Sequence, residues 1–373
     1  MANEKLADAK RAKYDEFYTQ YHDIEKEMSA YLEYDPDVFR GKTILLPCDD
    51  PEWSNFTRYF AQNFERIGLK KLISTSYAAE SKNYKASYQP TLFETRNPQF
   101  DQSKTTTHGK IFTLTSDRTG NREINIDDLE WHYLDGDGDF RSSEITSLRD
   151  EADVIITNPP FSLFRQFLRW IVEGEKLFVI IASLNAITYK EVFPLIMDNK
   201  IWLGNGFHAG NAYFFTPSAE NYGESVYMPE TGLVKFRNAC WFTNIDHGRR
   251  HQPLPLMTME DNLRFSKHKQ IKGKAAYDHY DNYDAIEVPY TDAIPSDYEG
   301  VMGVPISFLD KYSPDQFEIL GSDYEVKEGL LPDLVNSNWR GKMDRAYVNN
   351  RRMYSRILIR HRRENSNDHN PEN

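Results

Sequence analysis

Short hydrophobic runs alternate with longer amphipathic stretches between residues 42 and 244. The runs lie at residues 42–50, 69–77, 153–157, 176–183, 200–204 and 238–244. Short apolar runs bounded by turn formers predict buried strands, and apolar residues at helical spacing predict a helix over 164–173. This alternation predicts an α/β fold with a Rossmann-like, doubly wound, mostly parallel sheet.

The hydrophobic pattern also predicts a division of the chain. Residues 1–30 are expected to form a charged helical lead-in, on which Tyr14, Tyr18 and Tyr21 make a packing face. A polar stretch at 78–128 is predicted to be an insertion. Beyond residue 246 the periodicity weakens, and strand-like runs return only at 303–308, 316–320 and 354–360. We therefore predict a first domain over 1–246, a second region over 247–363 and a disordered tail over 364–373.

Composition excludes several classes of protein. The 373 residues are 39% hydrophobic, which favours a sizeable core over disorder. No apolar stretch approaches the roughly 20 residues of a membrane span, and the first residues lack the apolar segment of a signal peptide. Two cysteines, Cys48 and Cys240, are too few for a disulfide framework or a zinc site. We expect a cytoplasmic protein that acts as a monomer, without metal and away from membranes.

Charge is unevenly distributed along the chain. The net charge of −12 argues against binding nucleic acid by bulk attraction. Between Arg340 and Arg363, however, eight Arg and one Lys face a single acid, Asp344. A local basic surface of this kind indicates a nucleic-acid contact, although a solvated face is the simpler interpretation of any single Arg.

The strongest candidate for chemistry is Asn158-Pro159-Pro160-Phe161, directly after the run 153–157. Ligands of open α/β sheets bind beyond the carboxyl ends of such strands. Asn158 and the carbonyl of Pro159 supply two oxygen acceptors, Phe161 supplies an apolar ring, and Pro160 restricts the backbone. Two acceptors above an aromatic ring can hold a planar amino group for reaction. A plain turn is the alternative, because Asn-Pro and Pro-Pro are ordinary turn formers.

Residues 153–161, Asp-Val-Ile-Ile-Thr-Asn-Pro-Pro-Phe, resemble the catalytic motif of S-adenosylmethionine-dependent amino-methyltransferases. With its neighbours the chain is similar to the EcoRI-type adenine-specific DNA methyltransferases, roughly from Tyr14 to Arg360. The resemblance implies a class I methyltransferase fold and methyl transfer from S-adenosyl-L-methionine to adenine N6 in double-stranded DNA. It also implies that Asn158, Pro159, Pro160 and Phe161 form the catalytic set, in which Asn158 and the Pro159 carbonyl grip N6 of a flipped base and Phe161 stacks on it. The resemblance makes GAATTC a candidate recognition sequence.

The resemblance also implies a set of residues that contact the cofactor. A Phe-Tyr-Thr segment borders its methionine end, and two acids after the first strand face its ammonium group, although Asp50 could equally be a helix N-terminal acid. The second strand ends without the usual acid, which leaves ribose contact open. The predicted cofactor residues are Phe17, Tyr18, Thr19, Pro47, Cys48, Asp49, Asp50, Ser76, Tyr77, Asp139, Phe140 and Asn158.

Two glycine-containing segments admit more than one interpretation. The Asp-Gly run 135–139 suggests a calcium loop, but the spacing is wrong and Glu144 comes too early. The resemblance instead implies a turn in which Asp139 binds the cofactor adenine amine and Phe140 packs on its ring, with a plain turn as the alternative. Residues 204–207 could approach DNA or form an ordinary loop.

The C-terminal region is predicted to recognise the DNA target, because arginines suit phosphates and the guanine edge. The candidates are Arg249, Arg250, Arg345, Arg351 and Arg352. An RNA or protein-glutamine amino-methyltransferase would share the tetrapeptide, and a catalytically inactive DNA-binding relative is the third possibility.

Overall fold

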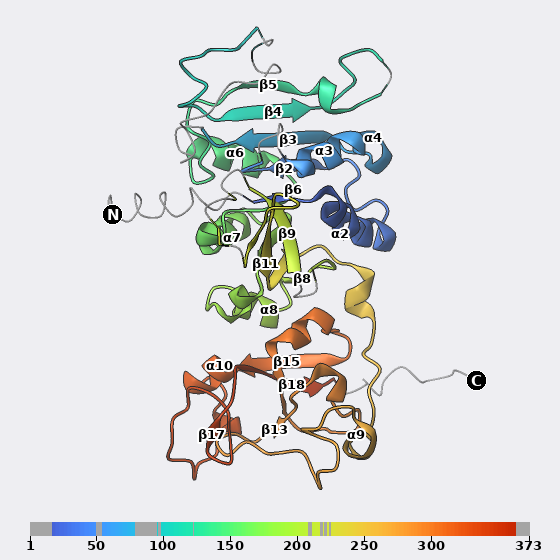
Figure 1. Cartoon of the computed structure of the whole chain (residues 1–373), viewed down its shortest axis with the longest axis vertical. Coiled ribbons are helices and arrows are strands. Elements are labelled where there is room, and N and C mark those ends of the chain that lie inside the picture. The colour runs from blue at the N-terminus through green and yellow to red at the C-terminus, as the bar shows by residue number, and fades with distance from the viewer. Residues whose placement is uncertain are drawn as a thin grey trace, which may run out of the picture. The chain divides into compact units, whose positions relative to one another are not determined.

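The computed structural model describes residues 17–49, 54–78, 95, 98–121, 123–207, 211–216, 219, 222–223 and 225–362. The chain divides into two compact units (Figure 1). Unit 1 comprises residues 1–195 and 200–248, and unit 2 comprises residues 196–199 and 249–373. The predicted tail lies outside the described residues, as do Tyr14 and Asp50.

An eight-stranded sheet forms the centre of unit 1. Its strands, in spatial order, are β5 (Glu130–Tyr133), β4 (Lys110–Leu114), β3 (Lys71–Ser76), β2 (Thr43–Leu46), β6 (Val154–Thr157), β7 (Leu177–Ser183), β12 (Ala239–Thr243) and β8 (Trp202–Leu203). The fully buried pattern of β2 and β6 explains why both strands are continuous apolar runs.

The mixed α/β architecture is confirmed, but the sheet is parallel only at its centre. Strands β3, β2, β6 and β7 pair in parallel. The outer strands β4, β5, β12 and β8 pair antiparallel. The polar stretch predicted as an insertion contributes β4, which extends the sheet directly from β3. Alternation of helices and strands could not reveal these antiparallel edges, because a hairpin needs no intervening helix.

Six α-helices of the described chain begin in or lie within unit 1. They are α2 (Tyr21–Tyr34), α3 (Asn55–Gln62), α4 (Phe64–Ile67), α6 (Ser143–Glu151), α7 (Phe164–Glu173) and α8 (Phe193–Met197). Ser54 caps α3 by accepting a hydrogen bond from the Phe56 N–H at 3.1 Å. Gly68, at φ 69°, ends α4 in the left-handed conformation that favours glycine.

A second sheet in unit 1 has the order β1 (Tyr18–Thr19), β9 (Asn211–Phe215), β11 (Leu233–Arg237) and β10 (Tyr227–Met228), all antiparallel. The predicted helix is therefore wrong for Tyr18 and Thr19, which pair with Phe215 and Phe214. The regular tyrosine spacing suggested a helix, whereas pairing with a strand almost 200 residues away decided the conformation.

Unit 2 contains a sheet of order β13 (Ile286–Glu287), β14 (Met302–Pro305), β18 (Arg356–His361) and β15 (Phe317–Ser322). A separate hairpin joins β16 (Tyr347–Val348) to β17 (Arg351–Arg352). The helices are α9 (Met259–Phe265) and α10 (Asp323–Lys327). Short 3₁₀ segments of the two units lie at Ile126–Asp128, Phe161–Leu163, Leu184–Thr188, Gly248–His251, Thr291–Ala293, Ile306–Lys311 and Pro332–Leu334. None of the helices in the described residues is long and apolar enough to cross a membrane.

Candidate functional site

The carboxyl ends of β2 and β6 are tied together by one threonine. The Thr157 hydroxyl lies 2.7 Å from the Pro47 carbonyl oxygen and 2.5 Å from Oδ2 of Asp49. Ser54 donates to the other oxygen of Asp49 at 2.9 Å. Because β2 and β6 run in parallel, Pro47, Cys48 and Asp49 emerge beside the Asn158 loop. The first strand and the tetrapeptide therefore meet at one edge of the sheet.

The Asn158 side chain is hydrogen-bonded through its amide nitrogen but not through its amide oxygen. Its Nδ2 donates to the Phe17 carbonyl oxygen at 2.7 Å and lies 3.5 Å from Oγ1 of Thr19. Its Oδ1 is buried and has no hydrogen-bond partner among the described residues. An unpaired buried acceptor is costly and demands an explanation. A ligand with an N–H group would supply the missing partner.

An aromatic cluster surrounds Phe161. The Phe161 ring centroid lies 5.6 Å from that of Phe17 and 6.0 Å from that of Phe236. Phe214 packs edge-on at 6.4 Å, and Tyr222 lies 6.0 Å from Phe17. Phe214, Tyr222 and Phe236 were not predicted as site residues from the sequence; they come from the second sheet and its connections. The aromatic residues at 213–215 and 236 carried a signal, but their partners could not be known without the strand pairing.

Cys48 follows β2 and has an unusual backbone conformation. Its φ of 69° lies in the left-handed region, which is unusual for a residue with a side chain. Strained backbone of this kind is concentrated at functional sites. Asp49 is only 5% exposed, and its neighbour Asp50 lies outside the described residues.

The turn at 135–139 lies against the end of β3. The Ala78 N–H donates to the Asp137 carbonyl oxygen at 2.7 Å, and a side chain at Gly138 would stand 2.3 Å from the Ser76 carbonyl oxygen. Gly138 also has a φ of 85°, so only glycine suits this close approach. Ser76 Oγ accepts from the Lys110 N–H at 3.2 Å, while Tyr77 is half-buried beside it.

Asp139 and Phe140 have protein partners that the sequence did not predict. Arg141 binds the Asp139 carboxylate through its backbone N–H at 2.8 Å and its Nε at 2.9 Å. Phe140 is 3% exposed and packs edge-on against Phe167 and Trp170 of α7, at centroid distances of 5.0 and 5.7 Å. The structure thus gives Phe140 a core position instead of an open ring face, because the amphipathic α7 buries its apolar side there.

The calcium interpretation of this turn receives no support. The Glu144 carboxylate accepts from the backbone N–H groups of Asp135 and Gly136 at 2.9 and 3.1 Å. The described residues contain no cluster of His, Cys, Asp and Glu that could hold a metal ion.

Residues 204–207 are explained by packing in unit 1. The buried Glu27 carboxylate accepts from the backbone N–H groups of Asn205, at 3.0 Å, and Gly206. Tyr31 donates to the same carboxylate at 2.6 Å, and its burial, together with Glu27, raises the pKa of its phenol. Phe207 stacks on Trp241 at 5.5 Å. These contacts favour the ordinary loop over an approach to DNA.

The five arginines predicted to bind DNA differ in their partners. Arg249 donates to the backbone and carboxylate of Asp310, and the 6%-exposed Arg250 donates to Asn199. Burial therefore makes Arg250 a structural residue. Arg345 lies 3.9 Å from Asp323, and Arg352 pairs with Asp344 at 2.8 Å. Arg351 is exposed, and its guanidinium has no partner among the described residues.

A mixed α/β unit with a polar loop at the carboxyl ends of parallel strands is typical of ligand-binding α/β proteins. Comparison of sequences narrows this class. The family described as "Adenine-specific methyltransferase EcoRI" matches residues 5–362. The chain belongs to this family, which confirms both the resemblance and the prediction of an adenine-specific methyltransferase.

Three relatives match the sequence over nearly the full length of the chain. The type II methyltransferase M.EcoRI of Escherichia coli is 39% identical over 97% of each chain. The type II methyltransferase M.MpnI of Mycoplasma pneumoniae is 30% identical over 95% of this chain and 97% of its own. A type II methyltransferase of Mycoplasma genitalium is also 30% identical, over 94% and 97%. No solved structure matches the chain.

Proposed function

We propose that this protein transfers the methyl group of S-adenosylmethionine to N6 of adenine in double-stranded DNA. The observation that carries the proposal is the buried, unpaired Oδ1 of Asn158, next to the Pro159 carbonyl and the Phe161 ring. Family membership supports adenine as the acceptor. In this proposal unit 1 is the class I catalytic domain, unit 2 is the target-recognition region, and one chain supplies every residue of the site.

The proposed chemistry depends on two acceptors. Oδ1 of Asn158 and the Pro159 carbonyl accept the two N6 hydrogens, which localises the nitrogen lone pair, and Phe161 packs on the purine. The cofactor supplies an electrophilic methyl group on a positively charged sulfur. In this transfer the bond from N6 to the methyl carbon would form as the sulfur–carbon bond breaks, the electron pair of that bond would remain on sulfur, and N6 would release a proton to solvent. The Asn158 Nδ2–Phe17 hydrogen bond keeps Oδ1 directed at the amine.

The chain also offers groups that suit the cofactor. The Asp49 carboxylate lies just beyond the end of β2 and accepts hydrogen bonds from the Ser54 and Thr157 hydroxyls, which orient it. We propose that Asp49 binds the cofactor ammonium group, with Phe17, Thr19, Cys48 and Tyr77 around the cofactor. The adenine that accepts the methyl group is flipped out of the duplex, because N6 cannot be reached within the stack.

Asn158→Ala tests the proposal. The variant should lower the rate of methyl transfer from labelled cofactor to duplex DNA by about 10²–10³-fold, as for removal of one oriented transition-state contact. Cofactor affinity, measured by calorimetry, should stay within about tenfold. Asn121→Ala, the same substitution in an exposed turn, serves as the control.

Unchanged turnover of Asn158→Ala would refute the assigned role. Parallel assays with RNA and protein acceptors would reveal the alternative amino-methyltransferases, since either could present an amide or amine to the same loop. Sequencing the methylated DNA and reading the modified adenines in context identifies the recognition sequence.

A further inference from the structure

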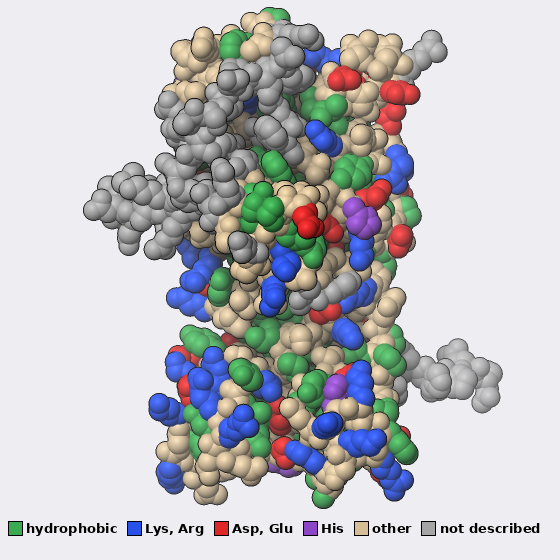
Figure 2. All heavy atoms as spheres, in the orientation of Figure 1, with side chains coloured by type: hydrophobic (Ala, Val, Ile, Leu, Met, Phe, Trp, Pro, Cys, Tyr) green, Lys and Arg blue, Asp and Glu red, His purple; other side chains and the backbone are tan. Residues whose placement is uncertain are grey.

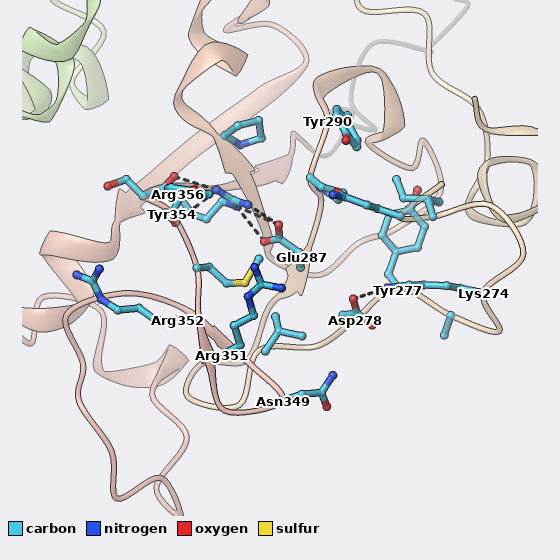
Figure 3. A pocket seen from close by; sticks show the side chains of 18 of the residues that line it. Lys274, Tyr277, Asp278, Glu287, Tyr290, Asn349, Arg351, Arg352, Tyr354 and Arg356 are labelled. Atoms are coloured by element: carbon cyan, nitrogen blue, oxygen red, sulfur yellow. Dashed lines mark hydrogen bonds and ion pairs between the residues drawn. The ribbon is translucent and has the colours of Figure 1, made fainter. Parts of the chain in front are cut away.

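Unit 2 contains a cavity of about 990 Å³ beside the β16–β17 hairpin (Figure 3). Four cationic side chains line it, against two acidic ones. The cations are Lys274, Arg351, Arg352 and Arg356, and the acids are Asp278 and Glu287. Lys and Arg side chains are also frequent on the face of unit 2 seen in Figure 2. This surface is locally positive in a chain of net charge −12, which favours a polyanionic ligand.

Three of the four cations already have acidic partners. Lys274 pairs with Asp278, and Arg352 pairs with Asp344. Arg356 is 7% exposed and binds Glu287 through two nitrogens, with Nε–Oε2 at 2.9 Å. Among the described cations that line the cavity, Arg351 is the one without an acidic partner. Figure 3 shows Arg351 and Arg352 extending from the same strand to different sides. The Arg351 guanidinium therefore has all five N–H donors available to a ligand.

The hairpin that carries Arg351 is held rigidly. The Asp281 carboxylate accepts from the backbone N–H groups of Asn349 and Asn350 at its tip, at 3.2 and 2.7 Å. At its base, the buried Asp323 accepts from the N–H groups of Ala346 and Arg356, at 3.1 and 2.8 Å. A guanidinium on such a fixed strand loses less conformational freedom on binding. The neighbouring Tyr354 is 86% exposed and offers an uncovered ring at the same cavity.

We propose that this cavity receives an edge of the DNA duplex and that Arg351 is the residue that binds it. The inference rests on the proposed function and adds to it a specific residue that contacts the DNA. Arg351 has the chemistry to bind O6 and N7 of a guanine, or the oxygens of a backbone phosphate. Arg352, its sequence neighbour, has a structural role through Asp344.

Fluorescence anisotropy with duplex DNA tests the proposal at salt concentrations between 50 and 200 mM. One duplex contains the recognition sequence read from methylated DNA, and the other lacks it. Arg351→Gln should weaken binding to the first duplex at least tenfold without changing the unfolding temperature. Arg360→Gln removes the same charge from a guanidinium that is already paired with Glu318 and does not line the cavity, so its affinity for DNA should stay within about threefold of wild type.

Further measurements distinguish a guanine contact from a phosphate contact. A guanine contact predicts that Arg351→Gln lowers the preference for the recognition sequence by about 5- to 150-fold and that Arg351→Lys does not restore it. A phosphate contact predicts equal losses on both duplexes, a salt slope smaller by about one, and rescue by Arg351→Lys.

Wild-type affinity and salt slope in Arg351→Gln would overturn the inference, as would an equal loss of affinity in Arg360→Gln. These outcomes are distinct from failure of the proposed function, which would appear as an inability of the wild-type enzyme to methylate any duplex DNA.

Discussion

At the scale of single residues, Thr157 is the side chain that ties the Asn158 loop to the end of β2. Its hydroxyl bridges the Pro47 carbonyl and the Asp49 carboxylate at the point where β6 gives way to Asn158. Thr75, on the neighbouring β3, is equally buried, but its hydroxyl has no hydrogen-bond partner among the described residues. The two threonines thus form a matched pair, and we expect their substitution by Val to have opposite effects on stability.

Thr157→Val should lower the free energy of unfolding by about 1–3 kcal/mol, because it leaves buried acceptors without their donor. It should also weaken cofactor binding, since Asp49 loses one of the groups that orient it. Thr75→Val should be neutral or slightly stabilising, because it removes an unsatisfied polar group. Urea unfolding and calorimetry measure both effects, and equal destabilisation by the two variants would contradict this assignment.

At the scale of elements, the β16–β17 hairpin depends on two asparagines with positive φ. Asn349 and Asn350 have φ values of 50° and 61°, as a two-residue turn of type I′ requires. Asn350→Gly should therefore preserve or slightly raise stability, whereas Asn350→Val should cost roughly 1–2 kcal/mol. Since this turn precedes Arg351, Asn350→Val should also weaken DNA binding. A stable Asn350→Val variant with normal DNA affinity would show that the turn does not position Arg351.

The same scale shows how far the sequence alone could lead. The central strands and α7 were predictable, because each is a local pattern of apolar residues bounded by turn formers. The second sheet of unit 1 was not, because β1 and β10 have two residues each and the partner of β1 is β9, far away in sequence. The same limit applies to the site. Asn158, Phe161 and Asp49 could be predicted as site residues from motifs, but the unpaired Oδ1 of Asn158 and the aromatic cluster depend on contacts between distant segments.

At the scale of the whole molecule, each unit has its own hydrophobic core. One cluster of buried residues lies entirely within unit 1, between Phe17 and Ile245. Another lies entirely within unit 2 and includes Tyr280, Tyr283 and Leu358. Buried Asp323 belongs to the polar framework of this second core, where Tyr283 donates to it at 3.0 Å. Burial raises the pKa of Asp323, and the hydrogen bonds donated by Arg356 and Tyr283 oppose this shift.

Separate cores lead us to expect two heat-absorption transitions in scanning calorimetry. Thr157→Val should shift only the transition of unit 1. Asp323→Asn should lower only the transition temperature of unit 2, by roughly 3 °C or more, because an amide NH₂ would face the Ala346 or Arg356 N–H in either orientation. A single transition shifted by both variants would show that the two cores unfold as one.

The raised pKa of Asp323 also predicts how the stability of unit 2 changes with pH. A carboxyl whose pKa is raised on folding stabilises the folded state most fully below its unfolded value of about 3.9, and this contribution disappears as pH rises through the folded pKa. The difference in unfolding temperature of unit 2 between the wild type and Asp323→Asn should therefore move in favour of the wild type as the pH falls from 7 to 4.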